Sequence, residues 1–562
     1  MDFNRYFNFS ELTALLDDYA KRFPDLCRVE SIGSSHEGRP ILLVTLTDFR
    51  SGAAESKPAL WADANLHATE VAGTTVVLSL IDRLLEGSIA GDNRCADLLK
   101  HAAFYLVPRA NPDGAERALG TIPEFLRSGV RQYPDTEADR GIHSQDIDGD
   151  GRILQMRIPD PHGDWKLSSL HPQLMEKRQP NDTVGAFYRL FPEGLIEDFD
   201  GFTIKTARPK ASLDFNRNFP YHWRPEGEQY GAGPYPTSEP EVRALVQFVS
   251  SHPNINCALC YHTFGGMLLR PYDDKADDQM ETNDLWVYEL LGKSGAELTG
   301  YVEGSVQKLL KYHPKEVITG SADSWLYDFH GIFAWTVELW DIVKHAGVEQ
   351  GEVMKWFRTH PHSDDLQVFN WYREHVPDGD GYVDWYPFEH PQLGAIEIGG
   401  WNKLYSWRNP PHRFMHDEAA KNVDFALWLA EVLPRLTIHH AEAKSIGDGV
   451  YHVQLVVDNA GYLPTFTSAR SRKVKAARPV RVELSLPENA ELLIGKLRTE
   501  VGHLEGRSNK FSAAGFSWVA SNTDNRAKID WTVKAPSGGS VDLAILSDRA
   551  GTIKHSLVLS PK

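Results

Sequence analysis

The stretch Asn65-Leu-His-Ala-Thr-Glu70 lies between a short apolar run, Ala59-Leu-Trp61, and a longer segment, Val71 to Leu85, with apolar residues at helical spacing. The first run predicts a buried strand, and the longer segment predicts a helix. Further apolar runs that predict strands alternate with helical segments along the chain: Ile41–Leu46, Phe104–Val107, Cys257–Tyr261 and Phe333–Leu339. This alternation indicates an α/β fold, in which a mixed, mainly parallel sheet carries helices on both faces.

Three potential metal ligands lie at or just after predicted strands. His67 and Glu70 follow the first strand, and His262 follows the strand that ends at Tyr261. In such sheets, sites form beyond the carboxyl ends of the strands. Two imidazoles and one carboxylate leave one coordination position open, as in catalytic zinc, whereas structural zinc usually has four protein ligands. An H-x-x-E pair arises easily by chance, so the prediction of one zinc ion depends on the surrounding sequence.

Glu338 stands in an apolar segment, Trp335-Thr-Val-Glu-Leu-Trp340. A buried carboxylate is costly unless it is paired, and burial raises its pKa. Glu338 is therefore a candidate to accept a proton from a zinc-bound water. A buried structural salt bridge is the alternative.

Several sequence blocks occur in the order and rough spacing of one known family, from about residue 5 to residue 430. They are Gly33-Ser-Ser-His-Glu-Gly-Arg-Pro40, Asn65-Leu-His-Ala-Thr-Glu70, Asn111-Pro-Asp-Gly114, Asp214-Phe-Asn-Arg-Asn-Phe219, Ser238-Glu-Pro-Glu241, Tyr261-His-Thr263, and Gly320-Ser-Ala-Asp-Ser-Trp325 leading to Glu338. In this order the blocks resemble the zinc carboxypeptidase family, the metallocarboxypeptidases with a funnel-shaped active site, in a bacterial-like form with a C-terminal β-domain. The resemblance implies a zinc-dependent hydrolase that removes the C-terminal residue of a peptide.

The resemblance also implies roles for polar residues outside the metal site. Asn216 and Arg217 match the pair that holds the free C-terminal carboxylate of the substrate, a task that suits the planar guanidinium of arginine. The family's oxyanion-stabilising arginine matches either Arg127 or Arg131, and Arg131 is slightly favoured. The family's mobile tyrosine has no counterpart in residues 316–319, since Tyr312 and Tyr327 are out of register.

Two acidic features have alternative interpretations. Asp323 could favour a basic side chain on the substrate, or it could be a framework residue that accepts backbone hydrogen bonds. Asp146, Asp148 and Asp150 start a calcium-type loop, but Arg157 stands where a bidentate Glu is expected. Bound Ca²⁺ or an acid-rich turn are both compatible with this pattern.

Two domains are expected from length and pattern. Residues 1–435 form the catalytic domain, with an insertion at about 132–213 that could wall the entrance of the funnel and restrict substrates to small or flexible peptides. Residues 436–562 contain alternating apolar and polar runs without a long helix, which predicts an all-β sandwich. A basic run in this part could dock an anionic partner or the acidic front domain, or form a solvated strand edge: Arg470, Arg472, Lys473, Lys475, Arg478 and Arg481.

Charge and cysteine usage limit the remaining classes of function. Of the net charge of −18, residues from Leu436 onward contribute +5 and the preceding residues −23, which disfavours nucleic acid as a partner. Four cysteines give no disulfide framework, and Cys257 and Cys260 are expected to be buried thiols on opposite faces of a strand. The sequence has no run of 18 apolar residues, so no membrane span is expected. No signal peptide follows Met1, so a cytoplasmic protein is expected if Met1 is the native start, whereas a trimmed export signal would leave the same sequence.

A peptide is the expected substrate, and the sequence leaves the oligomeric state open. Two alternatives to a carboxypeptidase remain. One is a zinc amidase or endopeptidase acting on peptidoglycan-type or glutamyl peptides, and the other is a non-catalytic peptide-binding protein.

Overall fold

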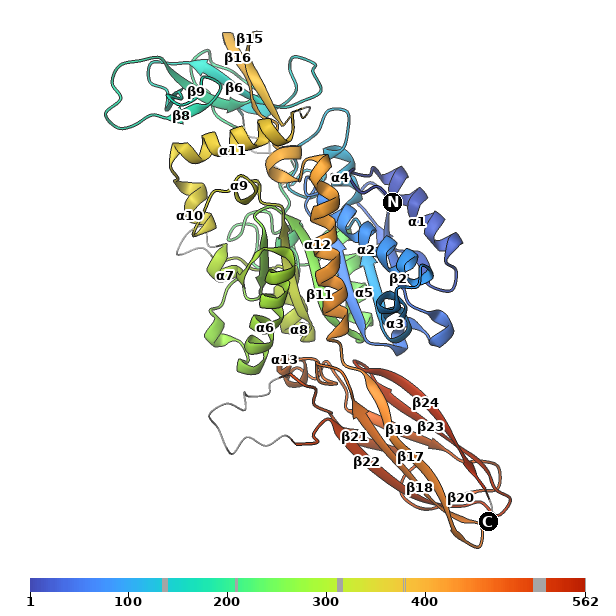
Figure 1. Ribbon diagram of the computed structural model, residues 1–562. Helices are drawn as coiled ribbons and strands as arrows, with labels where there is room; N and C mark the ends of the chain where they lie inside the picture. Colours follow the sequence, from blue (N-terminus) through green and yellow to red (C-terminus); the bar gives the residue numbers. More distant parts are fainter. Residues whose placement is uncertain are drawn as a thin grey trace.

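The computed structural model describes residues 1–133, 140–207, 211–310, 317–377, 379, 381–508 and 522–560. Figure 1 shows three parts stacked along one direction: a small β-rich cap, a central α/β body and an elongated β-domain that carries the C-terminus at its far tip.

The central body contains an eight-stranded sheet that matches the predicted fold class. Its order is β1 (Cys27–Ser34), β2 (Pro40–Leu46), β4 (Ala103–Val107), β3 (Ala59–Ala64), β11 (Ile255–Thr263), β14 (Phe333–Leu339), β12 (Met267–Arg270) and β13 (Val302–Ser305). The inner strands β4, β3, β11 and β14 are parallel to one another, as are β12 and β13. The β1–β2, β2–β4 and β12–β14 pairs are antiparallel. The predicted mixed, mainly parallel sheet is therefore confirmed.

Helices cover both faces of this sheet (Figure 1). One face carries α2 (Ala72–Ile89), α6 (Thr282–Thr299) and α12 (His412–Glu431), whereas α5 (Pro240–Ser251) and α8 (Ala322–His330) cover the other. Shorter or peripheral helices complete the body: α1 (Phe9–Arg22), α3 (Asn93–His101), α4 (Pro112–Ala118), α7 (Val306–Leu309), α9 (Ile342–His345), α10 (Val353–Arg358) and α11 (His362–His375). A Cβ on Gly73 would lie 2.9 Å from the Cβ atoms of Ala64 and Tyr261, so glycine lets α2 pack directly on the sheet just after Glu70.

The cap is built from two distant parts of the chain. Its antiparallel sheet has the order β15 (Tyr382–His390), β16 (Gly394–Trp401), β6 (Gln155–Pro159), β9 (Phe187–Pro192), β7 (Trp165–Leu167) and β8 (Met175–Lys177). The short pair β5 (Ile142–Ser144) and β10 (Gly194–Ile196) lies beside it. Its buried apolar cluster is separate from the main core and joins Met156 to Ile398. The insertion expected at about 132–213 therefore needs residues 382–401 to complete its sheet.

The C-terminal part is the expected all-β sandwich. One sheet has the order β17 (Leu436–Gly447), β18 (Val450–Asn459), β22 (Arg526–Lys534) and β20 (Glu491–Ile494), and the other β21 (Arg498–Gly502), β19 (Val480–Ser485), β23 (Gly539–Ser547) and β24 (Gly551–Leu559). Alternate residues of these strands fill a core of their own. The short helix α13 (Ala469–Lys473) faces the central body.

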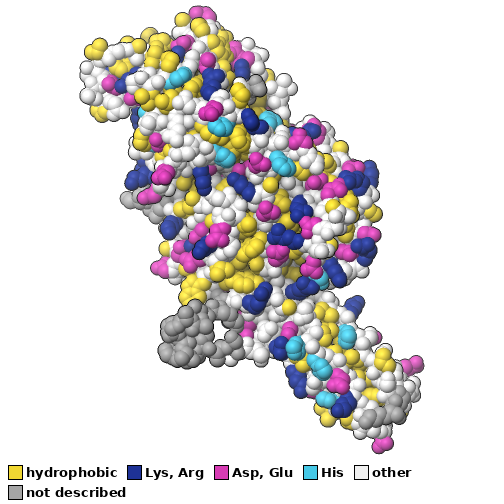
Figure 2. Space-filling view, viewed as in Figure 1, with side chains coloured by type: hydrophobic (Ala, Val, Ile, Leu, Met, Phe, Trp, Pro, Cys, Tyr) yellow, Lys and Arg dark blue, Asp and Glu magenta, His cyan; other side chains and the backbone are white. Residues whose placement is uncertain are grey.

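Part of the basic run of the C-terminal domain docks on the acidic central body. Docking on this body was one of the three interpretations of the run. Arg470 pairs with Asp328 at 2.8 Å, and Lys473 pairs with Glu281 at 2.6 Å. In Figure 2 acidic and basic side chains are interspersed over the visible face of the body, so the negative net charge does not form one continuous patch there.

Two further expectations concern cysteines and membranes. Cys27, Cys95, Cys257 and Cys260 are all free and buried, which confirms the buried thiols expected for Cys257 and Cys260. Among the described residues, every helix is too short or too polar to cross a lipid bilayer.

Candidate active site

His67, Glu70 and His262 converge at the carboxyl ends of β3 and β11. The Nδ1 atoms of His67 and His262 are 3.0 Å apart, and each lies 3.0 Å from Oε2 of Glu70. All three side chains are buried. Hydrogen bonds cannot link all three pairs in this triangle, because a carboxylate oxygen and two ring nitrogens do not supply enough protons. A cation with bonds of about 2.0–2.2 Å to N and O ligands satisfies all three at once, so the donor set fits zinc.

Asp214 supports the metal site from behind His67. Its Oδ1 lies 3.1 Å from Nε2 of His67, which leaves Nδ1 facing the other ligands. Burial opposes ionisation of Asp214, but the charges of Arg127 and Arg217 hold its pKa well below the usual range. A carboxylate in this position fixes the tautomer and the orientation of a ligating imidazole. Asp214 opens the motif Asp214–Phe219, but its role could not be predicted from the motif alone.

Glu338 lies beside the ligand set on the neighbouring strand. In the parallel pair of β11 and β14 it is the register partner of His262. Glu338 is half-buried, and burial together with the charge of Glu70 raises its pKa to about 7. A carboxyl group that titrates near neutral pH can both accept and return a proton.

The structure brings Arg127 and not Arg131 to this site. Nη1 of Arg127 lies 3.3 Å from Oε1 of Glu70, and its Nε donates to Oδ2 of Asp214 at 2.9 Å. Arg131 instead donates to the buried Glu239 at 2.6 Å and stacks over Tyr133. The slight preference for Arg131 over Arg127 is therefore not supported by the geometry.

Asn216 and Arg217 lie next to the start of α8. They belong to the short 3-10 helix η3 (Phe215–Arg217), where Asp214 accepts from the amide of Asn216. Oδ1 of Asn216 accepts from the amide of Ala322 at 2.9 Å, and a Cβ on Gly320 would lie 2.3 Å from the carbonyl oxygen of Arg217. Gly320, at φ +72°, thus permits close packing of these two segments. The half-buried guanidinium of Arg217 is held by the Asn216 carbonyl at 2.8 Å.

Comparison with known sequences identifies this arrangement. The sequence profile of the zinc carboxypeptidase family matches residues 12–142 and 192–353, which is more than half of the chain. The chain belongs to the zinc carboxypeptidase family. Residues 435–558 match a domain of unknown function. The family assignment makes the chain a metallopeptidase, and it implies zinc at the His67, Glu70 and His262 group.

Relatives of the family resemble the chain over its catalytic part. Carboxypeptidase B of Astacus astacus is 25% identical over 61% of this chain and 88% of its own length. Carboxypeptidase E of Caenorhabditis elegans is 30% identical over 38% of this chain and 45% of its own length. A crystal structure of thrombin activatable fibrinolysis inhibitor overlaps with 76% of this chain and 74% of its own, at 16% identity and a TM-score of 0.44.

Asp323 of this zinc carboxypeptidase lies in a buried acidic pair. Asp323 and Asp273 are 1% and 6% exposed, and Ser324 donates to Asp273 at 3.1 Å. Burial raises the pKa of both carboxyl groups, and the proximity of Asp323 raises that of Asp273 further. Among the described residues, the oxygens of Asp323 accept no hydrogen bond of good geometry. Contacts with the side chain of Ser321 and the backbone of Ser324 still oppose the rise in the pKa of Asp323, so the framework role and the specificity role both stay predictions.

Arg408 also reaches the metal ligands, although it lies outside every sequence motif of the site. Its Nη1 lies 3.6 Å from Oε1 of Glu70. It belongs to the short π-helix η5 (Leu404–Arg408), which follows the cap strand β16. A lone arginine in an aromatic-rich segment carries no motif, so the sequence offered no signal for it.

The calcium-type loop does not assemble as expected. Asp146 and Asp148 lie close to the buried Glu193, but Asp150 turns away to pair with Arg152 at 2.5 Å. Backbone amides already occupy Asp146 and Glu193. This geometry does not support Ca²⁺ bound by Asp146, Asp148 and Asp150, and the loop is explained as an acid-rich turn.

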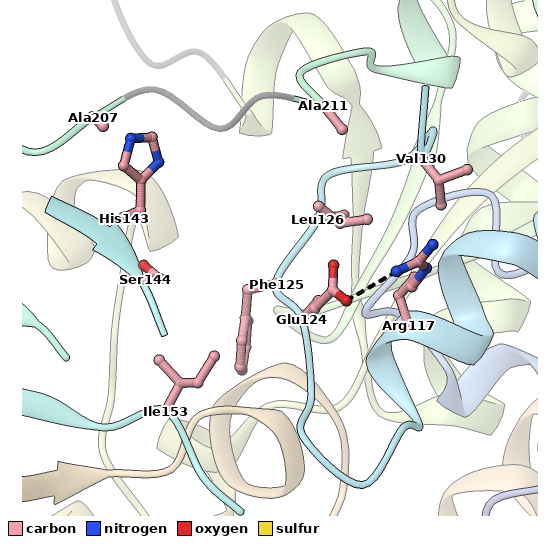
Figure 3. Close-up of a pocket in the computed structure, with 10 residues that line it drawn as sticks. All are labelled: Arg117, Glu124, Phe125, Leu126, Val130, His143, Ser144, Ile153, Ala207 and Ala211. Carbon is pink, nitrogen blue, oxygen red and sulfur yellow. Dashed lines mark hydrogen bonds and ion pairs between the residues drawn. The ribbon is translucent and has the colours of Figure 1, made fainter. Parts of the chain in front are cut away.

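A cavity of about 350 Å³ separates the cap from the segment that leads to Arg127. Figure 3 shows Phe125 and Leu126 on one side and His143 and Ile153 of the cap segment on the other, with the Arg117–Glu124 ion pair at one end. The cap therefore borders the chain segment that approaches the metal site.

The two tyrosines near the position of the family's mobile tyrosine are not seen at the site. Tyr312 lies outside the described residues, and the buried Tyr327 donates to Asp284 at 2.8 Å.

Proposed function

We propose that the protein is a zinc-dependent carboxypeptidase that hydrolyses the C-terminal peptide bond of peptides. The observation that carries this proposal is the His67, Glu70 and His262 triangle with 3.0 Å sides. Its support comes from Glu338 on the adjacent strand and from Asn216 and Arg217 on the neighbouring segment.

The reaction requires a nucleophile, a proton acceptor and a stabiliser of negative charge. When bound, zinc would lower the pKa of a water molecule and polarise the substrate carbonyl. The oxygen of the attacking water bonds to the carbonyl carbon while Glu338 takes a proton from this water. The π electron pair of the carbonyl group moves to the carbonyl oxygen. Arg127 donates to that oxygen. The electron pair on this oxygen then re-forms the C=O bond, and the C–N bond breaks. Glu338 delivers its proton to the leaving amine.

Arg217 and Asn216 select a substrate with a free C-terminus. A bidentate arginine–carboxylate pair gives both affinity and orientation. This anchor would restrict cleavage to the last peptide bond, whereas an amidase acting on internal bonds would not depend on it.

The buried pair of Asp273 and Asp323 favours a basic side chain at the cleaved end. The charge of Arg217 acts on Asp273 and that of His262 on Asp323, so both acids lie within electrostatic range of the proposed anchor or of a metal ligand. A lysine or arginine side chain would lower the pKa of these carboxyl groups and pair with the carboxylates, which offsets the burial that otherwise keeps them protonated.

The cap would limit access to the site from the side of Arg127. Its cavity, lined in part by Phe125, Leu126 and Ile153, would admit small or flexible peptides more readily than folded chains. We place the end of the catalytic domain near residue 435, where β17 of the sandwich begins. The free, buried cysteines are compatible with a reducing compartment such as the cytoplasm.

The decisive experiment measures free amino acids released from a mixed peptide library, with and without a zinc chelator. We expect release that the chelator stops and that is absent in Glu338→Gln. The same peptides with amidated C-termini serve as a matched control and should resist cleavage. Cleavage of amidated peptides that survives Arg217→Gln would favour the amidase, and zinc binding without any turnover would favour the peptide-binding protein.

A further inference from the structure

Arg408 approaches the metal ligands from an element outside the sequence blocks of the family. Its Nη1 lies 3.6 Å from Oε1 of Glu70, the same oxygen that Arg127 approaches at 3.3 Å. The other oxygen of Glu70, Oε2, faces His67 and His262. The two guanidinium groups therefore meet at the side of Glu70 that does not face the other ligands.

The next residue, Asn409, fixes Arg408 relative to Glu70. Asn409 is fully buried, and its Oδ1 accepts from the amide of Ala72 at 3.0 Å. Its Nδ2 donates to the carbonyl oxygen of Thr69 at 2.8 Å and to that of Leu404 at 2.9 Å. Since Thr69 and Ala72 flank Glu70, Asn409 holds the end of η5 directly on the metal-binding turn. The position of Arg408 is thus part of the built site and not a chance surface contact.

Most donors of the Arg408 guanidinium remain available for a ligand. Within the described chain, its hydrogen bond is a long one, 3.4 Å, to the carbonyl oxygen of Thr263. The guanidinium carbon, Cζ, lies over the ring of Phe264, 5.1 Å from its centroid. An arginine has five N–H donors, so this environment leaves several unused.

The exposure and charge of the two arginines point to an anionic ligand. The side chains of Arg408 and Arg127 are 32% and 43% exposed, whereas Glu70 is 2% exposed. Two cations that approach one carboxylate oxygen repel each other, and a second negative charge between them relieves this repulsion. In the proposed reaction such a charge develops on the carbonyl oxygen of the substrate.

We propose that Arg408 is a second oxyanion-binding residue, which donates together with Arg127 to the carbonyl oxygen as it gains charge. This inference rests on the proposed carboxypeptidase function. When the water oxygen adds to the carbonyl carbon and Glu338 takes its proton, the displaced electron pair resides on that oxygen. Arg408 holds this charge until the C–N bond breaks and the carbonyl re-forms.

The test compares the full-length chain with Arg408→Gln, Arg408→Lys and a control, Arg413→Gln. Arg413 is exposed at the start of α12 and donates to the carbonyl oxygen of His375, away from Glu70. The measurements are kcat and KM on a short peptide, zinc content, and the affinity for a peptide phosphonate, which carries tetrahedral anionic oxygens.

For Arg408→Gln we expect kcat to fall roughly 10²- to 10³-fold with KM changed little, as for loss of one oxyanion donor. Phosphonate affinity should fall by a similar factor, Arg408→Lys should retain part of both, and zinc content should stay at the level of the unaltered chain. An unchanged kcat, an effect on KM alone, or a loss explained by zinc release would overturn the inference. A lack of amino acid release by the unaltered chain would instead contradict the proposed function, and phosphonate binding would still test Arg408.

Discussion

His67 Nε2 and Asp214 Oδ1 are 3.1 Å apart, on the side of the imidazole ring away from Glu70 and His262. This contact determines which ring nitrogen faces the other ligands. Asp214 is itself held by Arg127 through Oδ2 at 2.9 Å and caps the turn that carries Asn216. One carboxylate thus joins the metal ligand, the arginine at the metal site and the proposed substrate anchor.

Asp214→Asn should weaken zinc binding, because an amide holds the His67 ring less firmly and adds no negative charge. Losses of about 10- to 100-fold in affinity are typical for such supporting partners. Competition with a chelator of known affinity measures this change. Asp160→Asn, in the Arg189 pair of the cap, is the matched control and should leave zinc affinity unchanged.

Arg127→Gln and Arg131→Gln should differ in kind. The first removes a guanidinium 3.3 Å from Glu70, so we expect kcat to fall roughly 10²-fold or more. The second leaves the buried Glu239 without its 2.6 Å partner, so unfolding should become easier by about 1–2 kcal/mol at nearly normal kcat. Kinetics and thermal unfolding of both variants test the assignment, and the opposite pattern would restore Arg131 to the site.

The sequence was sufficient to predict elements with local signals. Strand β3, the turn with His67 and Glu70, and helix α2 are contiguous, and their hydrophobic periodicity predicts each of them. Features that depend on distant pairing could not be predicted. The cap sheet joins β6 to β16, in which Arg157 pairs with Glu397, and neither strand identifies its distant partner.

Within the site, the same distinction applies to single residues. His262 and Glu338 could be placed together because each belongs to a predicted strand of one sheet. Arg408 reaches Glu70 only through the side-chain contacts of Asn409, and Asp273 meets Asp323 only through the packing of α8. Arg127 and Arg131 could not be ranked from sequence, since the direction of each side chain depends on the loop conformation.

Peptide hydrolysis should depend on the ionisation of Glu338. Since burial raises its pKa above the ordinary range, and the carboxylate is the active form, kcat/KM should rise with pH as Glu338 ionises and then level off. Glu338→Gln should abolish this rise and lower kcat by roughly 10²- to 10⁴-fold with zinc still bound. A profile of kcat/KM against pH measures this ionisation. A profile that levels off near pH 4.5 would contradict the role of Glu338 as the proton acceptor.

The same pKa has a consequence for the stability of the metal-free protein. A carboxyl group with a raised pKa in the folded state binds more protons there than in the unfolded state between about pH 4.5 and 7. Stability therefore falls as pH rises through this window, and Glu338→Gln should remove that fall. Melting temperatures of both metal-free proteins should agree near pH 4 and diverge above pH 7, with the variant higher.

Asp273→Asn should reduce the preference for basic C-terminal residues. If the buried pair receives a lysine or arginine side chain, loss of one charged partner should lower kcat/KM for such peptides roughly 10- to 100-fold. Peptides that end in phenylalanine should be unaffected. Asp274→Asn is the matched control, since Asp274 is engaged by Tyr221 and His222 at 2.7 Å each. Equal loss on both peptide types would show that Asp273 supports the fold and not specificity.

Arg549 should be the main polar anchor of the sandwich on the catalytic body. It is 1% exposed and donates to the carbonyl oxygens of Ile255, at the start of β11, and His330, at the end of α8. Asn256 donates back to its carbonyl oxygen at 2.9 Å. These contacts lie at the amino end of β11, whereas His262 lies near its carboxyl end. The anchor therefore supports the sheet from the end opposite to the metal site.

Arg549→Met should consequently destabilise the protein without changing its chemistry. The substitution leaves two buried carbonyl oxygens without a donor, at a cost of about 1–3 kcal/mol each. Burial lowers the pKa of Arg549 to about 10, which shows that burying its charge is costly. The variant avoids this cost, and this offsets part of the lost stability. Arg478→Gln is the matched control, because Arg478 is 73% exposed in its pair with Asp548 and should contribute at most about 1 kcal/mol. Denaturant unfolding measures the effect on stability, and kcat at low temperature measures the effect on catalysis. A fall in kcat without a fall in stability would mean that the sandwich acts on the active site and not merely on the sheet.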